Sequence, residues 1–235
     1  MHWCLGMYGS GSTWVFNVVL KAAHALYPDQ PVRSGFAMSP RDLAFLGDGS
    51  CIPIVKTHET DDMLRDLLDR RATARLISIR DPRDCLASLL TYHNLTYLEC
   101  FGRVLRSALF CAALAEHPGA LLFRYEDRFF NDPATITTIA ATFGHALSDA
   151  DRDRIYAETR RSAIEAMIAN LDSSPTVFHH ADPAETLDTV TQWHRHHAGR
   201  TGEIGRWRGI LSAEQVRDIE CGLGEFMERF AYEIS

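Results

Sequence analysis

The feature that most constrains the fold lies near the N-terminus, where an apolar run passes through a glycine-rich stretch into a helical pattern. The run Trp3–Tyr8 predicts a buried strand, and the residues from about Thr13 to Ala25 predict a helix. Between them, the stretch that begins at Gly6 reads Gly-Met-Tyr-Gly-Ser-Gly-Ser-Thr. Glycines let successive N–H groups point inward, and the helix that follows adds its unpaired N–H groups. The sequence therefore predicts a phosphate-binding loop between a strand and a helix.

The rest of the first half of the chain alternates short apolar runs with longer helical patterns. This alternation is typical of an α/β domain with a mostly parallel central sheet flanked by helices. Residues 27–49 are expected to form loop with some irregular helix. Further strands are expected at Cys51–Lys56, Arg75–Ile79 and Leu121–Phe123.

The second half is expected to be helical from Asp132 onward. In the last helix, Ser212 and Gln215 have the spacing of a capping box. Apolar residues then repeat at helical spacing and should face the core; they are Val216, Ile219, Leu223, Phe226 and Phe230. Because no linker or repeat divides the chain, residues 1–235 are expected to form a single domain.

The composition excludes several classes of protein. Of the 235 residues, 46% are hydrophobic and 23% are charged, and charged residues interrupt every apolar run, so no membrane span is expected. The net charge of −7 argues against general binding of nucleic acid. The six cysteines form no C-x-x-C pair, which favours a reduced, cytoplasmic chain. Only two of the 24 basic residues are lysines, Lys21 and Lys56.

Polar side chains follow three of the predicted strands. Lys56-Thr57-His58 ends the second strand, and side chains two apart on a strand point to the same side. Arg80 follows the third strand, and Ser88 lies two turns into a helix that Asp81-Pro82 should begin. Both can reach one anion, and the planar fork of an arginine suits a phosphate. Tyr125-Glu126-Asp127 follows the fourth strand.

These segments, in this order, resemble those of sulfotransferases that use 3′-phosphoadenosine 5′-phosphosulfate (PAPS). The loop Ser10–Trp14 resembles the family's S-G-T-T-W, Lys56–His58 resembles K-T-H, and Arg80–Ser88 reproduces R-x-x-x-D-x-x-x-S. Tyr125–Asp127 is similar to Y-E-D, and Arg200–Arg208 is similar to R-K-G-x-x-G-x-W-K.

The resemblance implies a P-loop-like α/β fold and a reaction. A sulfuryl group would pass from PAPS to a hydroxyl of a carbohydrate, a lipid-linked glycan or a small molecule, leaving adenosine 3′,5′-bisphosphate (PAP). His58 would be the general base, and Lys56 would stabilise charge on the leaving phosphate. Arginine meets the phosphate charge, so no metal is expected. The implied cofactor-binding residues are Gly9, Ser10, Gly11, Ser12, Thr13, Trp14 (stacked on adenine), Arg80, Ser88, Tyr125, Arg200, Thr201 and Gly202.

One departure keeps alternatives open. The family has a lysine at the position of Gly9, so Lys56 or an arginine must replace it, or the protein binds PAPS without turning it over well. A non-catalytic nucleotide-binding protein is therefore one alternative. A P-loop kinase or other ATP enzyme is another, although Ser12 stands where that loop has its lysine. The sequence does not specify the oligomeric state.

The remaining polar segments are interpreted more simply. The stretch from Trp193 to His197 is rich in histidine, but no carboxylate or cysteine follows at ligand spacing, so a metal site is not expected there. Loops at 33–49, 92–101 and 170–183 are expected to build the acceptor pocket.

Overall fold

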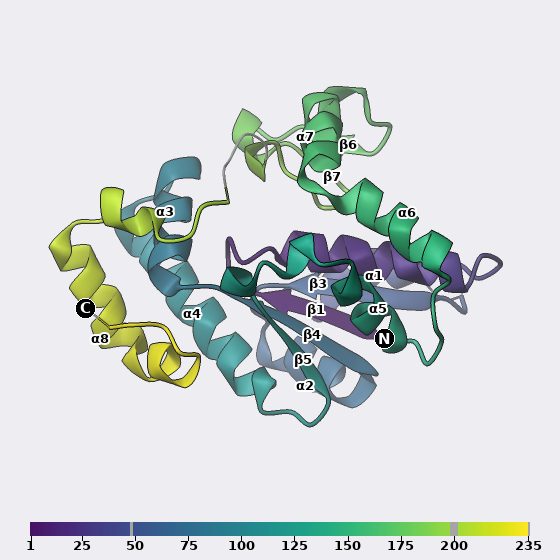
Figure 1. Cartoon of the computed structure of the whole chain (residues 1–235), viewed down its shortest axis with the longest axis horizontal. Helices are drawn as coiled ribbons and strands as arrows, with labels where there is room; N and C mark the ends of the chain where they lie inside the picture. Colours follow the sequence, from purple (N-terminus) through teal and green to yellow (C-terminus); the bar gives the residue numbers. More distant parts are fainter. Residues whose placement is uncertain (48, 198–201, 235) are drawn as a thin grey trace.

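Five parallel strands form the central sheet, in the order β2-β3-β1-β4-β5 (Figure 1). They are His2–Gly6 (β1), Val32–Phe36 (β2), Ile52–Thr57 (β3), Ala74–Ile79 (β4) and Ala120–Arg124 (β5). This computed structural model describes residues 1–47, 49–197 and 202–234. The expected α/β class with a mostly parallel sheet is confirmed.

The middle strand, β1, determines where a ligand can bind. It pairs with β3 on one side and with β4 on the other, so the order of the strands reverses at β1. In open parallel sheets, ligands bind outside the carboxyl ends of the strands at such a reversal. The glycine-rich loop follows β1 directly, and the predicted phosphate-binding loop therefore lies at this point.

Helices cover both faces of the sheet (Figure 1). One face carries α1 (Ser12–Leu26), α5 (Pro133–Ala141) and α6 (Asp149–Thr159). The other face carries α2 (Asp62–Arg71) and α4 (Tyr97–Ala115). Two further helices, α3 (Pro82–Tyr92) and α8 (Ala213–Arg229), pack against α4. Each face of the sheet has its own hydrophobic core, because successive side chains of a strand point to opposite faces. In β1, Trp3 and Leu5 pack with α4, whereas Cys4 packs with α1.

One strand was not expected from the sequence. Residues 27–49 contain the edge strand β2 and a 3-10 helix over Pro40–Leu46, where loop and irregular helix were expected. The strand reads Val-Arg-Ser-Gly-Phe, which is short, half polar and interrupted by Gly35, and it pairs only with β3. Tertiary pairing, not intrinsic preference, makes this segment a strand.

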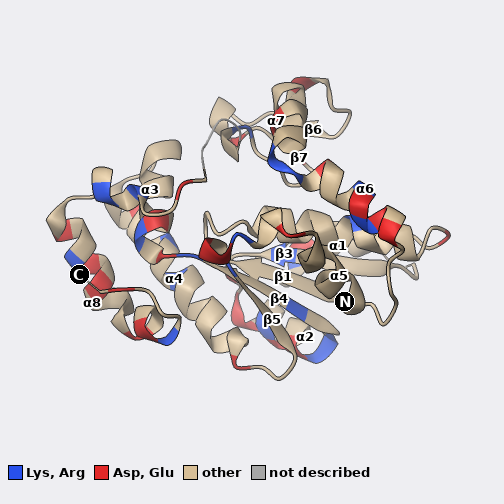
Figure 2. Cartoon of the chain, viewed as in Figure 1, with Lys and Arg blue, Asp and Glu red and all other residues tan. Residues whose placement is uncertain are grey.

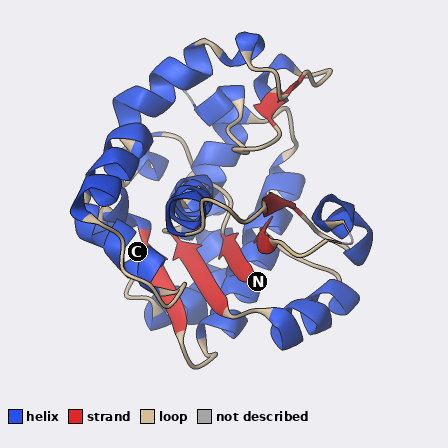
Figure 3. Cartoon of the chain, turned by 90° about the vertical axis from the view of Figure 1, so that its right-hand side faces the viewer, coloured by secondary structure: helices blue, strands red, loops and turns tan. Residues whose placement is uncertain are grey.

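A second correction concerns the segment that we call the cap, residues 161–197. The helix α7 (Arg161–Ala169) opens it, but a small antiparallel hairpin follows where helix was expected; its strands are Val177–Phe178 (β6) and Leu187–Asp188 (β7). Figure 3 shows this hairpin apart from the central sheet. Asn17 on α1 ties the cap to the body of the protein, because its amide donates to the Thr191 carbonyl at 2.7 Å.

The last helix agrees with its prediction. Ser212 and Gln215 form the expected capping box at the start of α8. Ile219, Leu223 and Phe226 are buried against α4 and its neighbours. On the outer surfaces of α6 and α8, acidic and basic side chains are mixed, so neither helix presents a uniformly basic face (Figure 2). Among the described residues, no helix combines the length and apolar character needed to cross a membrane.

Candidate active site

The glycine-rich loop is held tightly against the end of β4. The Ser10 hydroxyl is fully buried; it donates to the Met7 carbonyl at 2.7 Å and lies 2.8 Å from the hydroxyl oxygen of Ser78. A Cβ atom on Gly6 would lie only 2.2 Å from the Ser78 hydroxyl oxygen, so only glycine fits there. No side chain caps α1, whose first residue is Ser12. The unpaired amides of its first turn therefore remain available to an anion.

Lys56 reaches this loop from the end of β3. Its side chain is 3% exposed, and its ammonium donates to the Thr13 hydroxyl at 2.8 Å. Burial lowers the pKa of Lys56 to about 8, and the neighbouring Cys4 opposes that shift. A buried cation without a carboxylate partner is costly unless an anion compensates it. The position of this charge makes the loop suited to an anion.

His58 lies two residues further on, beside the same loop. Its Nδ1 atom is 2.6 Å from the carbonyl oxygen of Gly6, so Nδ1–H donates and Nε2 keeps its lone pair. The ring stacks on Tyr8 with the ring centres 4.1 Å apart. Burial above all, and then the charge of Lys56, lowers the pKa of His58 to about 3. The imidazole is therefore neutral near pH 7, with the lone pair of Nε2 unprotonated.

Arg80 continues the site from the end of β4. Its guanidinium donates to the carbonyl of Gly9 at 3.1 Å and to the carbonyl of Glu203 at 2.9 Å. It also lies over the ring of Tyr125, 4.2 Å from the ring centre. Its Nε is buried and makes no hydrogen bond in the described part of the chain. This one side chain thus joins the glycine-rich loop to the late segment near Gly202.

The late segment is fixed by Asp84 of α3. The buried carboxylate accepts from the amides of Gly205, at 2.7 Å, and Trp207, at 3.0 Å, and is 3.5 Å from the Arg80 guanidinium. Asp81 caps α3 as predicted, because its side chain accepts from the amide of Arg83. Asp84 therefore positions the late segment and pairs with Arg80. Arg80 and Ser88, the other predicted positions of this motif, line the cavity.

Tyr125 and Gly202 meet on the far side of the site. The Tyr125 hydroxyl donates to the Gly202 carbonyl at 3.3 Å, and a Cβ atom on Gly202 would lie 2.6 Å from that hydroxyl. Burial is the main cause that raises the pKa of Tyr125. The predicted contributions of Arg200 and Thr201 fall outside the described residues, so they stay predictions.

Trp14 forms part of the cavity wall from the first turn of α1. It is 4% exposed; its indole N–H donates to the Thr159 carbonyl at 3.0 Å, and its ring packs edge-on against Phe129. These contacts fix the ring at the edge of the site. Its predicted stacking on adenine stays a prediction.

The backbone conformation restricts which residues can stand at the position of Gly9. Gly9 is exposed and has φ +74°, a conformation that residues with a side chain rarely adopt. A Cβ atom there would lie 3.5 Å from Ser88, which is ordinary contact. Conformation and not space therefore restricts this position. Two cations contact the loop, Lys56 at Thr13 and Arg80 at Gly9.

Most of the predicted site residues line one cavity of about 770 Å³; they are Gly9, Gly11, Ser12, Thr13, Trp14, Lys56, His58, Arg80, Ser88, Tyr125 and Gly202. Ser10 is not among the lining residues, because its hydroxyl faces Met7 and Ser78. The acceptor side of the cavity contains Phe36, Met38 and Tyr92, in agreement with two of the three loops expected to form it. The third expectation is wrong. Residues 170–183 do not line the cavity. The cap lines it with other residues, which are Arg161, Ile164, Glu165, Glu185, Leu187, Gln192, Trp193, His194, His196 and His197. Residues 97–101 also differ from expectation, because they form the first turns of α4.

The fold was compared with known proteins. A mouse sulfotransferase, SULT7A1, in complex with PAP superimposes with a TM-score of 0.65 at 17% sequence identity, over 97% of this chain and 84% of that chain. Retinol dehydratase in complex with androsterone and the inactive cofactor PAP gives a TM-score of 0.56 at 15% identity, over 97% and 80%. Its complex with retinol and PAP gives 0.57 at 16% identity, over 96% and 80%. No protein-family model and no curated protein sequence matches the chain.

The chain has the sulfotransferase fold. The expectation drawn from the order of the motifs is therefore confirmed for the fold. The chain spans most of each of these structures, so the likeness covers the sheet, both helical layers and the cap.

Within this sulfotransferase fold, the sequence motifs contain most of the residues that line the cavity beside the glycine-rich loop, and few of those that line it on the cap side. Tyr8, which stacks on His58, belonged to the glycine-rich segment but was given no role. His93 and Glu185 were not singled out, yet they meet the predicted histidine-rich segment in the cavity wall. Only the fold brings these residues together, because about ninety residues separate His93 from Glu185.

Proposed function

We propose that this protein is a sulfotransferase that moves a sulfuryl group from PAPS to a hydroxyl of an acceptor. One observation carries the proposal: a buried lysine and a neutral, oriented histidine converge on one anion-binding loop. Lys56 contacts Thr13 of that loop, and His58 is held by Gly6 at its start. The sulfotransferase fold and the PAP bound in the similar structures support the same assignment.

The residues of the loop would hold the 5′-phosphosulfate. The free amides at the start of α1 and the ammonium of Lys56 supply positive charge from two directions. On the other side, Arg80 would grip the 3′-phosphate together with Ser88, since both line the cavity. The buried Nε of Arg80, which makes no hydrogen bond within the described chain, fits a site that is completed by an anion.

The transfer itself is a displacement at sulfur. The acceptor oxygen forms the new bond to sulfur as its proton passes to Nε2 of His58. The bond from sulfur to the bridging oxygen breaks, and the electron pair leaves with PAP. Lys56 and the loop amides stabilise the charge that develops on the leaving phosphate. The role of the protein is therefore to position, to accept one proton and to stabilise charge, as in phosphoryl transfer.

The acceptor is proposed to be a hydroxyl of a carbohydrate, a lipid-linked glycan or a small molecule. The cavity of about 770 Å³ has to hold both the donor and the reacting end of the acceptor. Its acceptor side combines aromatic and cationic groups, among them Tyr8 and Arg103, whose guanidinium is 5.7 Å from the ring centre. Such a wall suits an acceptor with both an apolar face and polar groups.

The direct test is to incubate the protein with PAPS and a panel of hydroxyl acceptors and to measure PAP formation and sulfated product. We expect turnover with at least one acceptor class, and loss of it in His58→Ala. The exposed His179 provides a matched control, and His179→Ala should turn over normally. Tight binding of PAP without release of sulfate to any acceptor or to water would instead support the non-catalytic alternative that Gly9 leaves open.

A further inference from the structure

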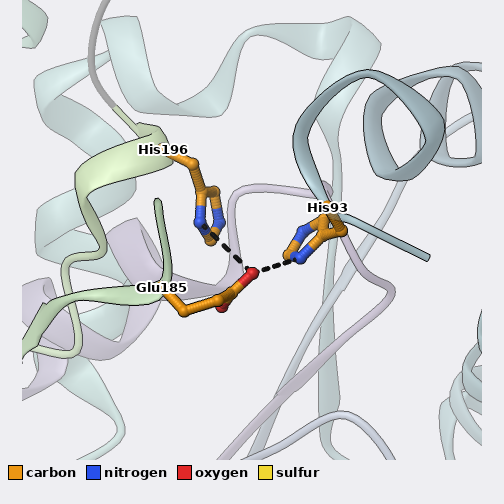
Figure 4. A group of neighbouring side chains, drawn as sticks. All are labelled: His93, Glu185 and His196. Atoms are coloured by element: carbon orange, nitrogen blue, oxygen red, sulfur yellow. Dashed lines mark ion pairs between the residues drawn. The ribbon is translucent and has the colours of Figure 1, made fainter. Parts of the chain in front are cut away.

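A cluster of histidines around one carboxylate lies in the cap wall of the cavity. Glu185 Oε1 is 2.5 Å from Nδ1 of His93 and 3.9 Å from Nδ1 of His196 (Figure 4). One candidate donor atom from each of these three residues lies within 4.8 Å of those of the other two. The three side chains are only 11% to 25% exposed, which is unusual for an ordinary surface group of charged residues.

The contacts within the cluster leave donor atoms unused. Nδ1 of His194 is buried, lies 3.5 Å from Glu185 Oε2 and makes no hydrogen bond among the described residues. In His196, Nδ1 is 3.0 Å from the Ala184 carbonyl oxygen, so Nδ1–H donates there and Nε2 keeps its lone pair. Histidines that bind metals commonly have this arrangement, with one ring nitrogen tied to a carbonyl and the other on the metal.

We propose that His93, Glu185 and His196 form a binding site for a first-row divalent metal ion, with Zn²⁺ as the best-matched ion. Two imidazoles and one carboxylate are a set of donors that zinc accepts, and a fourth position stays open for water, for His194 or for a group in the cavity. This inference does not rest on the proposed sulfuryl transfer, and it differs from the expectation that the sequence gives no metal site.

The absence of a carboxylate near the histidine-rich run motivated that expectation. In the structure, the carboxylate comes from Glu185, eight residues before the start of the run, and a further imidazole comes from the end of α3. His93 is the residue that follows α3, whereas Glu185 and His196 belong to the cap. A bound ion would therefore join the cap to α3 across the cavity.

The first test is calorimetry with Zn²⁺ on untagged protein freed of metal with a chelator. We expect one equivalent to bind and the melting temperature to rise with the concentration of free Zn²⁺. Glu185→Gln keeps the size of the side chain and should weaken binding at least about tenfold, because it removes the charged ligand. The control is His179→Ala, which removes an exposed histidine of the same cap and should bind as wild type does. Equal affinity for Zn²⁺ in wild type and Glu185→Gln overturns the proposal.

The second test needs no variant. Co²⁺ added to the wild-type protein should give visible bands of a four- or five-coordinate site without the thiolate charge-transfer band that cysteine ligands produce. A spectrum identical to that of aqueous Co²⁺, or one with a thiolate band, overturns the proposal. PAP binding, measured in the same samples, reports on the proposed function separately. If PAP binds and the metal does not, the proposed metal site fails and the proposed function stands. If the metal binds and PAP does not, the proposed function fails and the metal site stands.

Discussion

The two sides of the cavity are built in different ways. The phosphate side consists of residues at the ends of β1, β3 and β4, fixed by buried hydrogen bonds such as Ser10 to Ser78 and Lys56 to Thr13. The cap side consists of the short helix α7, 3-10 turns and a two-stranded hairpin. The carboxyl ends of paired strands hold a few side chains with little conformational freedom. The structure of the cap depends instead on contacts between segments that are distant in the sequence. The difference predicts that variants on the phosphate side change chemistry and cofactor affinity, and that variants in the cap change acceptor use and local stability.

The largest expected effect is on the phosphate side, at His58. His58→Ala should lower turnover by a factor on the order of 10² to 10⁴, because general-base assistance contributes that much, while PAP affinity stays near wild type. Steady-state kinetics and calorimetry measure the two quantities. Because burial holds the pKa of His58 at about 3, protonation of this ring should not slow the reaction between pH 7 and pH 5. Near-normal turnover in the variant would show that His58 only supports Tyr8.

Lys56 should have the next largest effect. Lys56→Met should reduce turnover by a factor on the order of 10² to 10³, as removal of one group that stabilises developing charge does in other enzymes. Lys56→Arg should recover part of the rate, since the guanidinium places its charge differently. The matched control is Lys21→Met, which removes a half-exposed lysine paired with Glu158 on the outer surface. A rate for Lys56→Met within about threefold of wild type, or ~0.65 kcal/mol in barrier height, would mean that this ammonium does no chemical work.

The same lysine predicts a pH dependence of cofactor binding. Burial lowers the pKa of Lys56 to about 8 in the free protein, so the ammonium is charged below that pH and loses its proton above it. A bound anion favours the charged form and raises this pKa, so binding takes up protons above about pH 8. PAP affinity should therefore fall as pH rises from 7 to 9.5, and the fall should disappear in Lys56→Met. Calorimetry at several pH values tests this, and an affinity that rises with pH contradicts it.

A smaller effect is expected for the 3′-phosphate. Arg80→Ala should weaken PAP by roughly 1.5–3 kcal/mol, which is the range for a hydrogen bond to a charged group. Adenosine 5′-phosphate lacks the 3′-phosphate and should be weakened much less, which makes it the internal control for the contacts of Arg80 with Gly9 and Glu203. Equal losses for the two nucleotides would place Arg80 at a different phosphate.

The smallest effect on cofactor binding is expected in the cap, at Asp188. Burial opposes its ionisation, but hydrogen bonds from Ser174, Thr176 and Thr191 lower its pKa. The resulting stability is present above the ordinary pKa of an aspartate and is lost as pH falls through the lowered value. Asp188→Asn should lower the free energy of unfolding by roughly 1–3 kcal/mol and raise KM for the acceptor, with PAP affinity unchanged. The control is Asp153→Asn, which alters an exposed carboxylate on α6. Loss of PAP affinity in Asp188→Asn but not in this control would mean that the cap side of the cavity is coupled to the side that holds the cofactor.

The sequence predicts well which residues gather beside the glycine-rich loop, because each motif there is contiguous with the strand that positions it. Lys56-Thr57-His58 ends β3, and Arg80 follows β4, so local patterns and the parallel order were sufficient. The edge strand β2 was missed because its polar residues and Gly35 carry no alternating pattern, and β3 supplies its only pairing. The histidine cluster was missed because Glu185 joins it from a separate turn. Such contacts depend on tertiary packing, which short-range spacing does not encode.

The cofactor itself provides the most direct test of the central claim. Calorimetry should compare PAP, adenosine 5′-phosphate and ADP with Mg²⁺ under the same conditions. We predict that PAP binds at least about tenfold more tightly than either of the others, a difference of about 1.4 kcal/mol. The reason is the proposed contact of the 3′-phosphate with Arg80 and Ser88, which both line the cavity. Tighter binding of ADP with Mg²⁺ than of PAP would contradict the account and identify the glycine-rich loop as that of an ATP enzyme.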